Sequence, residues 1–193
     1  ANVGNKVLLL NNGDGTFRRQ EFDSDPALDV LTSSVALGDV TGDALPDIVS
    51  LHYVEDNTML KRPELGEDGN VLTVSPASFV PGVDRIAVND GKGGFVSEKV
   101  SDSAQAPSTG LGVVIADWDG QPGNEIFVGN DVRPNHLWSR ASDLTEKVEG
   151  GSDPAGSSRR WQDIAALTGC AHGSGGVSTA SMGIAVADFD GNG

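Results

Sequence analysis

The sequence predicts an all-β fold, namely a segment of a β-propeller built from four-stranded antiparallel blades. Gly is frequent, at 26 of 193 residues, and it lies mostly in short runs between apolar segments. That distribution is typical of many short strands joined by turns. Two segment types also alternate along the chain, one built around an acidic loop and one around a Gly-rich turn. Together they supply about four strands per repeat, which is the number in a propeller blade.

The first segment type is an apolar run followed by an acidic loop, and it occurs three times. The leading acids of the three loops are Asp39, Asp117 and Asp188, so the repeats are offset by 78 residues (39 to 117) and 71 residues (117 to 188). A second apolar run follows the first two loops. We therefore expect a strand on each side of these loops.

The second segment type is a hairpin. Residues 5–22 and 84–100 each consist of two strand-like runs around a Gly-rich tight turn. In the first copy Gly13 and Gly15 supply the positive φ that such turns require. Phe17 and Phe95 occupy the same offset and are expected to anchor the returning strands. A weaker third copy, NHLWSR followed by RWQDIAAL, has a longer insert in place of the turn.

The whole chain, residues 1–193, is expected to form one partial propeller of about two to three blades with two inserts. The first insert, residues 54–83, is rich in turn and proline patterns. The second, residues 141–158, is polar and rich in Gly and Ser, which is typical of a surface loop. A closed propeller needs at least four blades. We therefore expect further blades or subunits to complete the ring.

Composition excludes some partners. The formal net charge of −15 repels phosphate backbones, so nucleic acid is not expected as a ligand. No apolar run approaches the roughly 20 residues that a membrane-spanning helix needs. The single cysteine, Cys170, cannot form an internal disulfide, and it is expected to be a buried small side chain rather than a reactive thiol.

The acidic loops predict Ca²⁺ sites. Ca²⁺ takes six to eight oxygen ligands, and a cation between crowded carboxylates offsets their mutual repulsion. The alternative is that these loops are turns capped by their own Asp side chains. The candidate ligands are Asp39, Thr41, Asp43, the Leu45 carbonyl and Asp47 in the first loop; Asp117, Asp119, Gln121, the Gly123 carbonyl and Glu125 in the second; and Asp188, Asp190 and Asn192 in the third.

Other metal motifs fit less well. An EF-hand loop that began at Asp39 would need Gly and Glu where Ala44 and Ser50 stand, and it would need helices on both sides. Mg²⁺ demands stricter octahedral geometry than such loops offer. No His or Cys accompanies the acids, which argues against zinc.

These loops resemble those of the FG-GAP/VCBS repeat proteins, whose best-known members are the integrin α-subunit propellers. Their Ca²⁺ loop follows D-x-[DN]-x-[DN]-G-x-x-D, which Asp39, Asp43 and Asp47 match, whereas Thr41 and Ala44 depart from it. The stretches VGNDVRPNHLWSR and WQDIAALTGCAHGSGGVSTASMGIAVADFDGNG are similar to bacterial relatives of cartilage acidic protein, the ASPIC/UnbV-type group. The resemblance covers most of the chain outside the inserts. It implies a calcium-binding propeller of a kind that serves as adhesin, surface scaffold or accessory domain.

The function expected from these features is not enzymatic. It is a calcium-stabilised adhesion or protein-interaction module, extracellular or periplasmic, with a protein or glycan ligand on one propeller face. The alternative is an accessory domain, carbohydrate-binding or structural, of a secreted enzyme or a larger assembly. His52, His136 and His172 are scattered without the arrangement of a Ser-His-Asp triad.

Three tryptophans and one group of Asn and Asp side chains each allow a structural and a ligand-binding interpretation. Trp118, Trp138 and Trp161 are predicted to pack between blades, with stacking on sugar as the alternative for any that is exposed. Asn130, Asp131 and Asn135 are predicted to cap turns near the second acidic loop, with ligand contact as the alternative.

Overall fold

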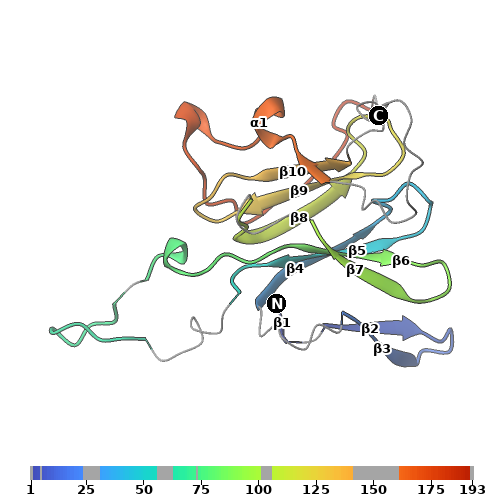
Figure 1. Ribbon diagram of the computed structural model, residues 1–193, viewed down its shortest axis with the longest axis horizontal. Coiled ribbons are helices and arrows are strands. Elements are labelled where there is room, and N and C mark those ends of the chain that lie inside the picture. Colours follow the sequence, from blue (N-terminus) through green and yellow to red (C-terminus); the bar gives the residue numbers. More distant parts are fainter. Residues whose placement is uncertain are drawn as a thin grey trace, which may run out of the picture.

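The fold is all-β, and its strands form three antiparallel sheets (Figure 1). The computed structural model describes residues 2–4, 6–23, 31–55, 63–72, 74–100, 106–140 and 161–191. In spatial order, the five-stranded sheet contains β1 (Asn2–Val3), β4 (Leu31–Gly38), β5 (Asp47–His52), β6 (Arg85–Asn89) and β7 (Phe95–Lys99). The four-stranded sheet contains β11 (Trp161–Asp163), β10 (His136–Arg140), β9 (Glu125–Asn130) and β8 (Gly110–Ala116). The third sheet is the hairpin of β2 (Lys6–Asn11) and β3 (Phe17–Asp23).

The predicted repeat is visible in the strand pairing. Strands β4 to β7 and strands β8 to β11 each run as a four-stranded antiparallel meander. In each meander the first two strands end on an equivalent rung, Gly38 opposite Asp47 and Ala116 opposite Glu125. The register of both pairs also shifts at the same distance before the leading acid, after Thr32 and after Gly110. The two units therefore match in local geometry, although no sheet of the described residues closes on itself.

The two large sheets pack against each other through their first strands. A cluster of buried side chains lies between them: Val40, Val49, Leu51, Ile86, Val100, Ile126, Val128 and Trp138. Two glycines permit the close approach of β8 to β4 and β5. A Cβ atom at Gly38 would lie 2.7 Å from Ile115 Cγ2, and one at Gly110 would lie 2.8 Å from Leu51 Cδ1. The core thus fixes the relative position of the ends of β4 and β8, where the acidic loops begin.

Helical structure is limited to short pieces. A second small cluster, Leu137, Ala165 and Ala171, lies where β10 meets α1 (Ala165–Thr168). Two 3-10 turns, η2 (Pro76–Ser78) and η4 (Ser174–Gly176), complete the described helices. None of the helices that these residues form has the length and apolar character that a bilayer span requires.

Several sequence expectations need correction. The apolar run before Asp188 is not a strand, and the segment after Trp161 leaves the sheet after Asp163 and enters α1. Trp138 and Trp161 contribute to the core, but Trp118 is 44% exposed. Phe17 is also exposed, so it does not anchor its strand by burial.

Of the two expected inserts, only the first contains described residues. Within its described residues, the predicted insert at 54–83 forms isolated bridges, such as Val54 with Pro81, and the turn η2. The predicted insert at 141–158 lies outside the described residues. Cys170 is half-buried and packs against the small cluster near α1.

Candidate metal centre

The second acidic loop brings three carboxylates together. It joins β8 to β9, and Asp117, Asp119 and Glu125 each offer an oxygen within 4.8 Å of the other two. Oxygens that bind one Ca²⁺ at about 2.3–2.6 Å lie no more than roughly 5 Å apart, so the spacing fits a shared ion. Glu125 is buried, whereas the two aspartates are exposed. The group therefore has an enclosed base and an open mouth, and it could hold a metal ion.

Backbone hydrogen bonds hold these carboxylates in place. Asp117 Oδ1 accepts from the N–H of Gly120 at 2.7 Å, and Asp119 Oδ1 accepts from the N–H of Gln121 at 2.8 Å. Glu125 Oε2 accepts from the N–H of Trp118 at 2.9 Å, which ties the first residue of β9 to the start of the loop. Each of these groups keeps a second oxygen for other contacts.

The electrostatics of Glu125 reflect this crowding. Burial is the main cause that raises the pKa of Glu125, and the charges of Asp119 and Asp117 raise it further. The hydrogen bond from Trp118 opposes them by lowering the pKa. A bound cation would reverse the effect of the neighbouring charges, because it stabilises all three carboxylates in their ionised form.

The first acidic loop has the same plan but a tighter arrangement. It joins β4 to β5, and Asp39 Oδ1 accepts from the N–H groups of Thr41, Gly42 and Asp43 at 3.2, 2.6 and 3.2 Å. Its Oδ2 accepts from the N–H of Ala44 at 2.7 Å. Burial raises the pKa of Asp39, but these four backbone donors outweigh burial and lower it overall.

The last carboxylate of the first loop, Asp47, is completely buried. Its oxygens accept from the N–H of Val40 at 3.1 Å and from the N–H of Asn89 at 2.9 Å. The bond from Val40 corresponds to the bond from Trp118 in the second loop, because each joins the residue after the leading acid to the acid that opens the next strand. Asp43 Oδ1 accepts from the N–H of Leu45, which is half-buried. The first loop thus has the hydrogen bonds of the alternative interpretation, in which the acidic loops are turns capped by their own Asp side chains.

All three loops share one turn. The leading acid accepts from a glycine N–H three residues later, at 2.6 Å from Gly42, 2.7 Å from Gly120 and 2.8 Å from Gly191. These glycines have φ values of 79°, 72° and 71°, in the left-handed region that favours glycine. In the third loop the turn contains Asp188 and the exposed Asp190, whereas Asn192 lies outside the described residues.

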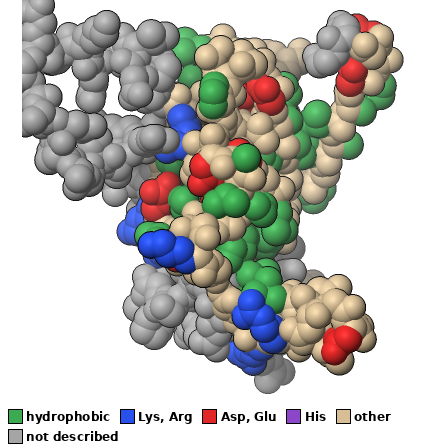
Figure 2. All heavy atoms as spheres, turned by 90° about the vertical axis from the view of Figure 1, so that its right-hand side faces the viewer, with side chains coloured by type: hydrophobic (Ala, Val, Ile, Leu, Met, Phe, Trp, Pro, Cys, Tyr) green, Lys and Arg blue, Asp and Glu red, His purple; other side chains and the backbone are tan. Residues whose placement is uncertain are grey.

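The first two loops also pack against each other. The N–H of Asn124 donates to the carbonyl of Asp39 at 2.9 Å, and a Cβ atom at Gly42 would lie 2.9 Å from the backbone of Pro122. A Cβ atom at Gly123 would lie 3.1 Å from the carbonyl oxygen of Val40. Both loops lie on the right-hand side of Figure 1, and Figure 2 shows acidic and hydrophobic side chains interspersed on that end of the molecule.

The predicted ligand sets therefore differ in how far the structure gathers them. Among the described residues, the second loop brings together three carboxylates, while the exposed Gln121 and the half-buried Gly123 lie in the same loop. In the first loop Asp39 and Asp47 are turned toward backbone donors, and Thr41 follows Asp39 in the same turn. Asn130 and Asn135 do cap turns, as predicted, but they lie at the opposite end of β9 from the second loop.

Sequence reasoning did not identify a pocket near that opposite end of β9. His136 and Asp163 meet there because Trp138 pairs with Asp163 across β10 and β11.

Comparison of the chain with protein-family models, with curated proteins and with solved structures found no match.

Proposed function

We propose that the chain is a calcium-binding β-propeller segment of the FG-GAP/VCBS type that acts outside the cytoplasm as an adhesion or protein-interaction module. The observation that carries this proposal is the carboxylate group of Asp117, Asp119 and Glu125 in a loop whose geometry recurs. Three acids crowded at the end of a strand destabilise the fold unless a cation offsets their repulsion. Ca²⁺ suits them better than Mg²⁺ because it tolerates irregular oxygen geometry.

The arrangement of the sheets supports the propeller part of the proposal. Two antiparallel four-stranded meanders follow each other in sequence, contact each other through their first strands and present equivalent loops at one end. Successive blades of a propeller have this relation. A calcium ion in a loop that contacts the neighbouring unit would stabilise the junction of two blades, and a stable face is what a protein or glycan ligand requires.

Calcium titration of metal-free protein by isothermal calorimetry tests the metal site. Glu125→Gln removes the buried charge and is expected to weaken binding at the second loop by about tenfold or more, since a charged ligand is lost. Glu67→Gln, at an exposed carboxylate away from the acidic loops, is the matched control and should bind as the wild type does. An unchanged affinity and stoichiometry in Glu125→Gln would place any calcium elsewhere.

Thermal unfolding with and without calcium supplies a second test. An ion that binds only the folded state adds about 2.7 kcal/mol at a free concentration 100 times its Kd. The melting temperature should therefore rise with calcium and fall with a chelator. A melting temperature that neither calcium nor the chelator changes would contradict the proposal. A panel of immobilised proteins and glycans, probed in calcium and in chelator, tests whether recognition depends on the ion.

A further inference from the structure

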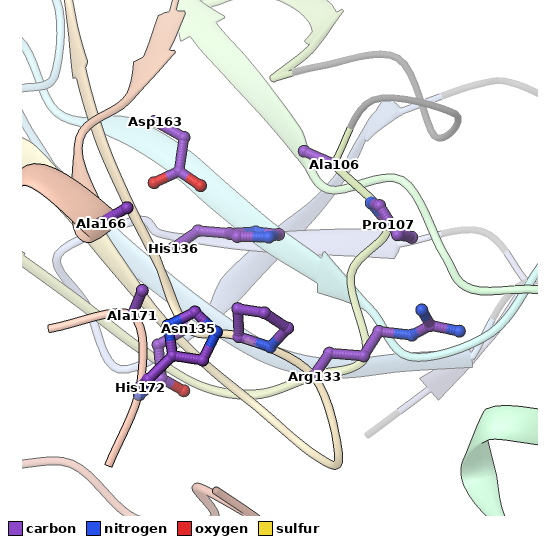
Figure 3. Close-up of a pocket in the computed structure, with 10 residues that line it drawn as sticks. Ala106, Pro107, Arg133, Asn135, His136, Asp163, Ala166, Ala171 and His172 are labelled. Carbon is purple, nitrogen blue, oxygen red and sulfur yellow. The ribbon is translucent and has the colours of Figure 1, made fainter. Parts of the chain in front are cut away.

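A pocket of about 280 Å³ lies beside the turn that joins β9 to β10 (Figure 3). Its wall includes Arg133 from that turn, His136 from the start of β10, Asp163 from the end of β11, and Ala166 and His172 from the segment that contains α1. Pockets that bind small molecules usually measure about 300–1,000 Å³, so this one suits a small ligand. Its position is independent of the acidic loops, because β9 separates the two by roughly 17 Å at about 3.3 Å per residue.

The frame of the pocket is rigid. The N–H of Asn130 donates to Asn135 Oδ1 at 3.0 Å, and Asn135 Nδ2 donates to the carbonyl of Cys170 at 3.3 Å. On the other side, Asp163 Oδ1 accepts from the N–H groups of Leu137 and Ala165 at 3.1 and 3.0 Å. Asn135 and Asp163, two polar residues of the wall, are therefore held in place without a ligand, as a built binding site requires.

Two buried polar atoms of the wall lack hydrogen-bond partners within the described ranges. His136 is only 4% exposed, and its Nδ1 has no hydrogen-bond partner among the described residues. Its ring is fixed edge-on against Trp138, with the ring centroids 5.1 Å apart. Arg133 Nε is likewise buried without a partner in the described part of the chain. A buried polar group without a partner destabilises the fold, so a ligand that satisfies both groups would recover that energy.

The charges of the wall define the ligand. Figure 3 shows the Asp163 carboxylate and the Arg133 side chain on opposite sides of the His136 ring. Asp163 already accepts two backbone hydrogen bonds, whereas Arg133 Nε has no acceptor among the residues that the structure describes, so the charge that needs a partner is positive. Burial lowers the pKa of His136, and the Asp163 charge opposes this by raising it. A neutral imidazole next to a carboxylate is suited to a hydroxyl group, which both donates and accepts.

We propose that this pocket binds a small carboxylic acid that carries hydroxyl groups, such as a sugar acid. The carboxylate would pair with Arg133, and a hydroxyl group would bridge His136 Nδ1 and Asp163. On a chain of net charge −15 the overall field does not attract anions, so the local guanidinium must supply the selectivity.

Calorimetric titration in calcium-containing buffer with D-glucuronate as the probe tests this proposal. D-glucose, which lacks the carboxylate, and inorganic phosphate, which lacks the sugar hydroxyl groups, are the comparison ligands. Glucuronate should bind saturably, and glucose and phosphate should each bind at least about tenfold more weakly, since a charged hydrogen bond accounts for about that factor. Absence of saturable glucuronate binding at millimolar concentration, or equal binding of glucose or of phosphate, would overturn the proposal.

Three variants locate the site. Arg133→Gln should weaken glucuronate binding about tenfold, and His136→Phe, which keeps a ring against Trp138, should also weaken it. Ala166→Phe adds bulk at an exposed position of the wall and should block the pocket without removing a polar group. Arg18→Gln, at an exposed arginine of β3, is the matched control. Glucuronate binding that survives in Arg133→Gln and Ala166→Phe variants with wild-type melting curves would refute the assignment.

Discussion

Asp84 is a buried carboxylate whose replacement should make the protein more stable at neutral pH. It immediately precedes β6 and is only 3% exposed. One oxygen accepts from the N–H of His52 at 3.0 Å, but the other, Oδ2, has no partner among the described residues. The nearby Ser108 hydroxyl donates to Asn130 Oδ1 at 3.0 Å in this arrangement. The charged form of Asp84 is therefore poorly compensated.

The expected change in the free energy of unfolding follows from the pKa of Asp84. Burial raises the pKa of Asp84 from 3.8 to about 7, whereas the nearby Ser108 hydroxyl and the hydrogen bond from the N–H of His52 lower it by a smaller amount. At about 1.4 kcal/mol per pKa unit, ionisation of this group costs the folded state about 4 kcal/mol above pH 7. Because the folded pKa exceeds the unfolded one, the cost is absent below about pH 4 and grows as the pH rises toward 7. Asp84→Asn removes this dependence.

Urea denaturation of wild type and Asp84→Asn at about pH 4 and about pH 8 measures the effect. The variant should gain about 4 kcal/mol relative to wild type between the two pH values, whatever constant cost of about 1–2 kcal/mol the buried amide adds. Glu67→Gln, which removes an exposed carboxylate, is the control for net charge. Parallel pH profiles for wild type and Asp84→Asn would show that Asp84 is not a buried acid and would refute the reasoning.

Two further predictions concern the packing around Gly82 and the buried hydroxyl group of Tyr53. A Cβ atom at Gly82 would lie 1.8 Å from the carbonyl oxygen of His52, so Gly82→Ala should lower the free energy of unfolding, measured by urea denaturation, by about 3 kcal/mol. At Gly183 nothing lies within 4 Å of such an atom, so the control Gly183→Ala should change stability by less than about 0.5 kcal/mol. Similar costs for the two variants would contradict the packing around Gly82. Burial, together with the hydrogen bond to Asp131 at 2.8 Å, raises the pKa of Tyr53 to about 12. Because the chain has one tyrosine, an ultraviolet titration should show this midpoint directly, and Asp131→Asn should lower it toward 10; a wild-type midpoint near 10 would disprove the contact.

The sequence was informative where structure is local. The turn in which a leading Asp accepts from a glycine three residues later depends on neighbouring residues alone, and it recurs in all three acidic loops. The hairpin turns after Asn11 and Asn89 have the same character, since Asp14 and Asp90 accept backbone hydrogen bonds within their own turns. Spacing of Asp and Gly therefore predicted both the strand ends and the carboxylate group of the second loop.

Long-range pairing explains what the sequence did not predict. The pocket depends on the register of β10 against β11, which are 20 residues apart between Arg140 and Trp161, and no local pattern specifies that register. Trp118 was expected in the core because of its strand-like sequence context, and the corresponding residue of the first loop, Val40, is indeed buried. Val40 is covered because the second loop packs over the first, whereas Trp118 begins a loop that has no such cover among the described residues and is 44% exposed.

Strand β9 shows how one core positions two sites. Its first residue, Glu125, is the buried member of the carboxylate group, and its last, Asn130, fixes the turn beside the pocket. Between them Ile126 and Val128 are completely buried in the contact between the sheets. A shift of one residue along β9 would turn these apolar side chains out of the core, so the register is strongly determined. The same burial therefore fixes the carboxylate group at one end of the strand and the wall of the pocket at the other, although the two share no residue.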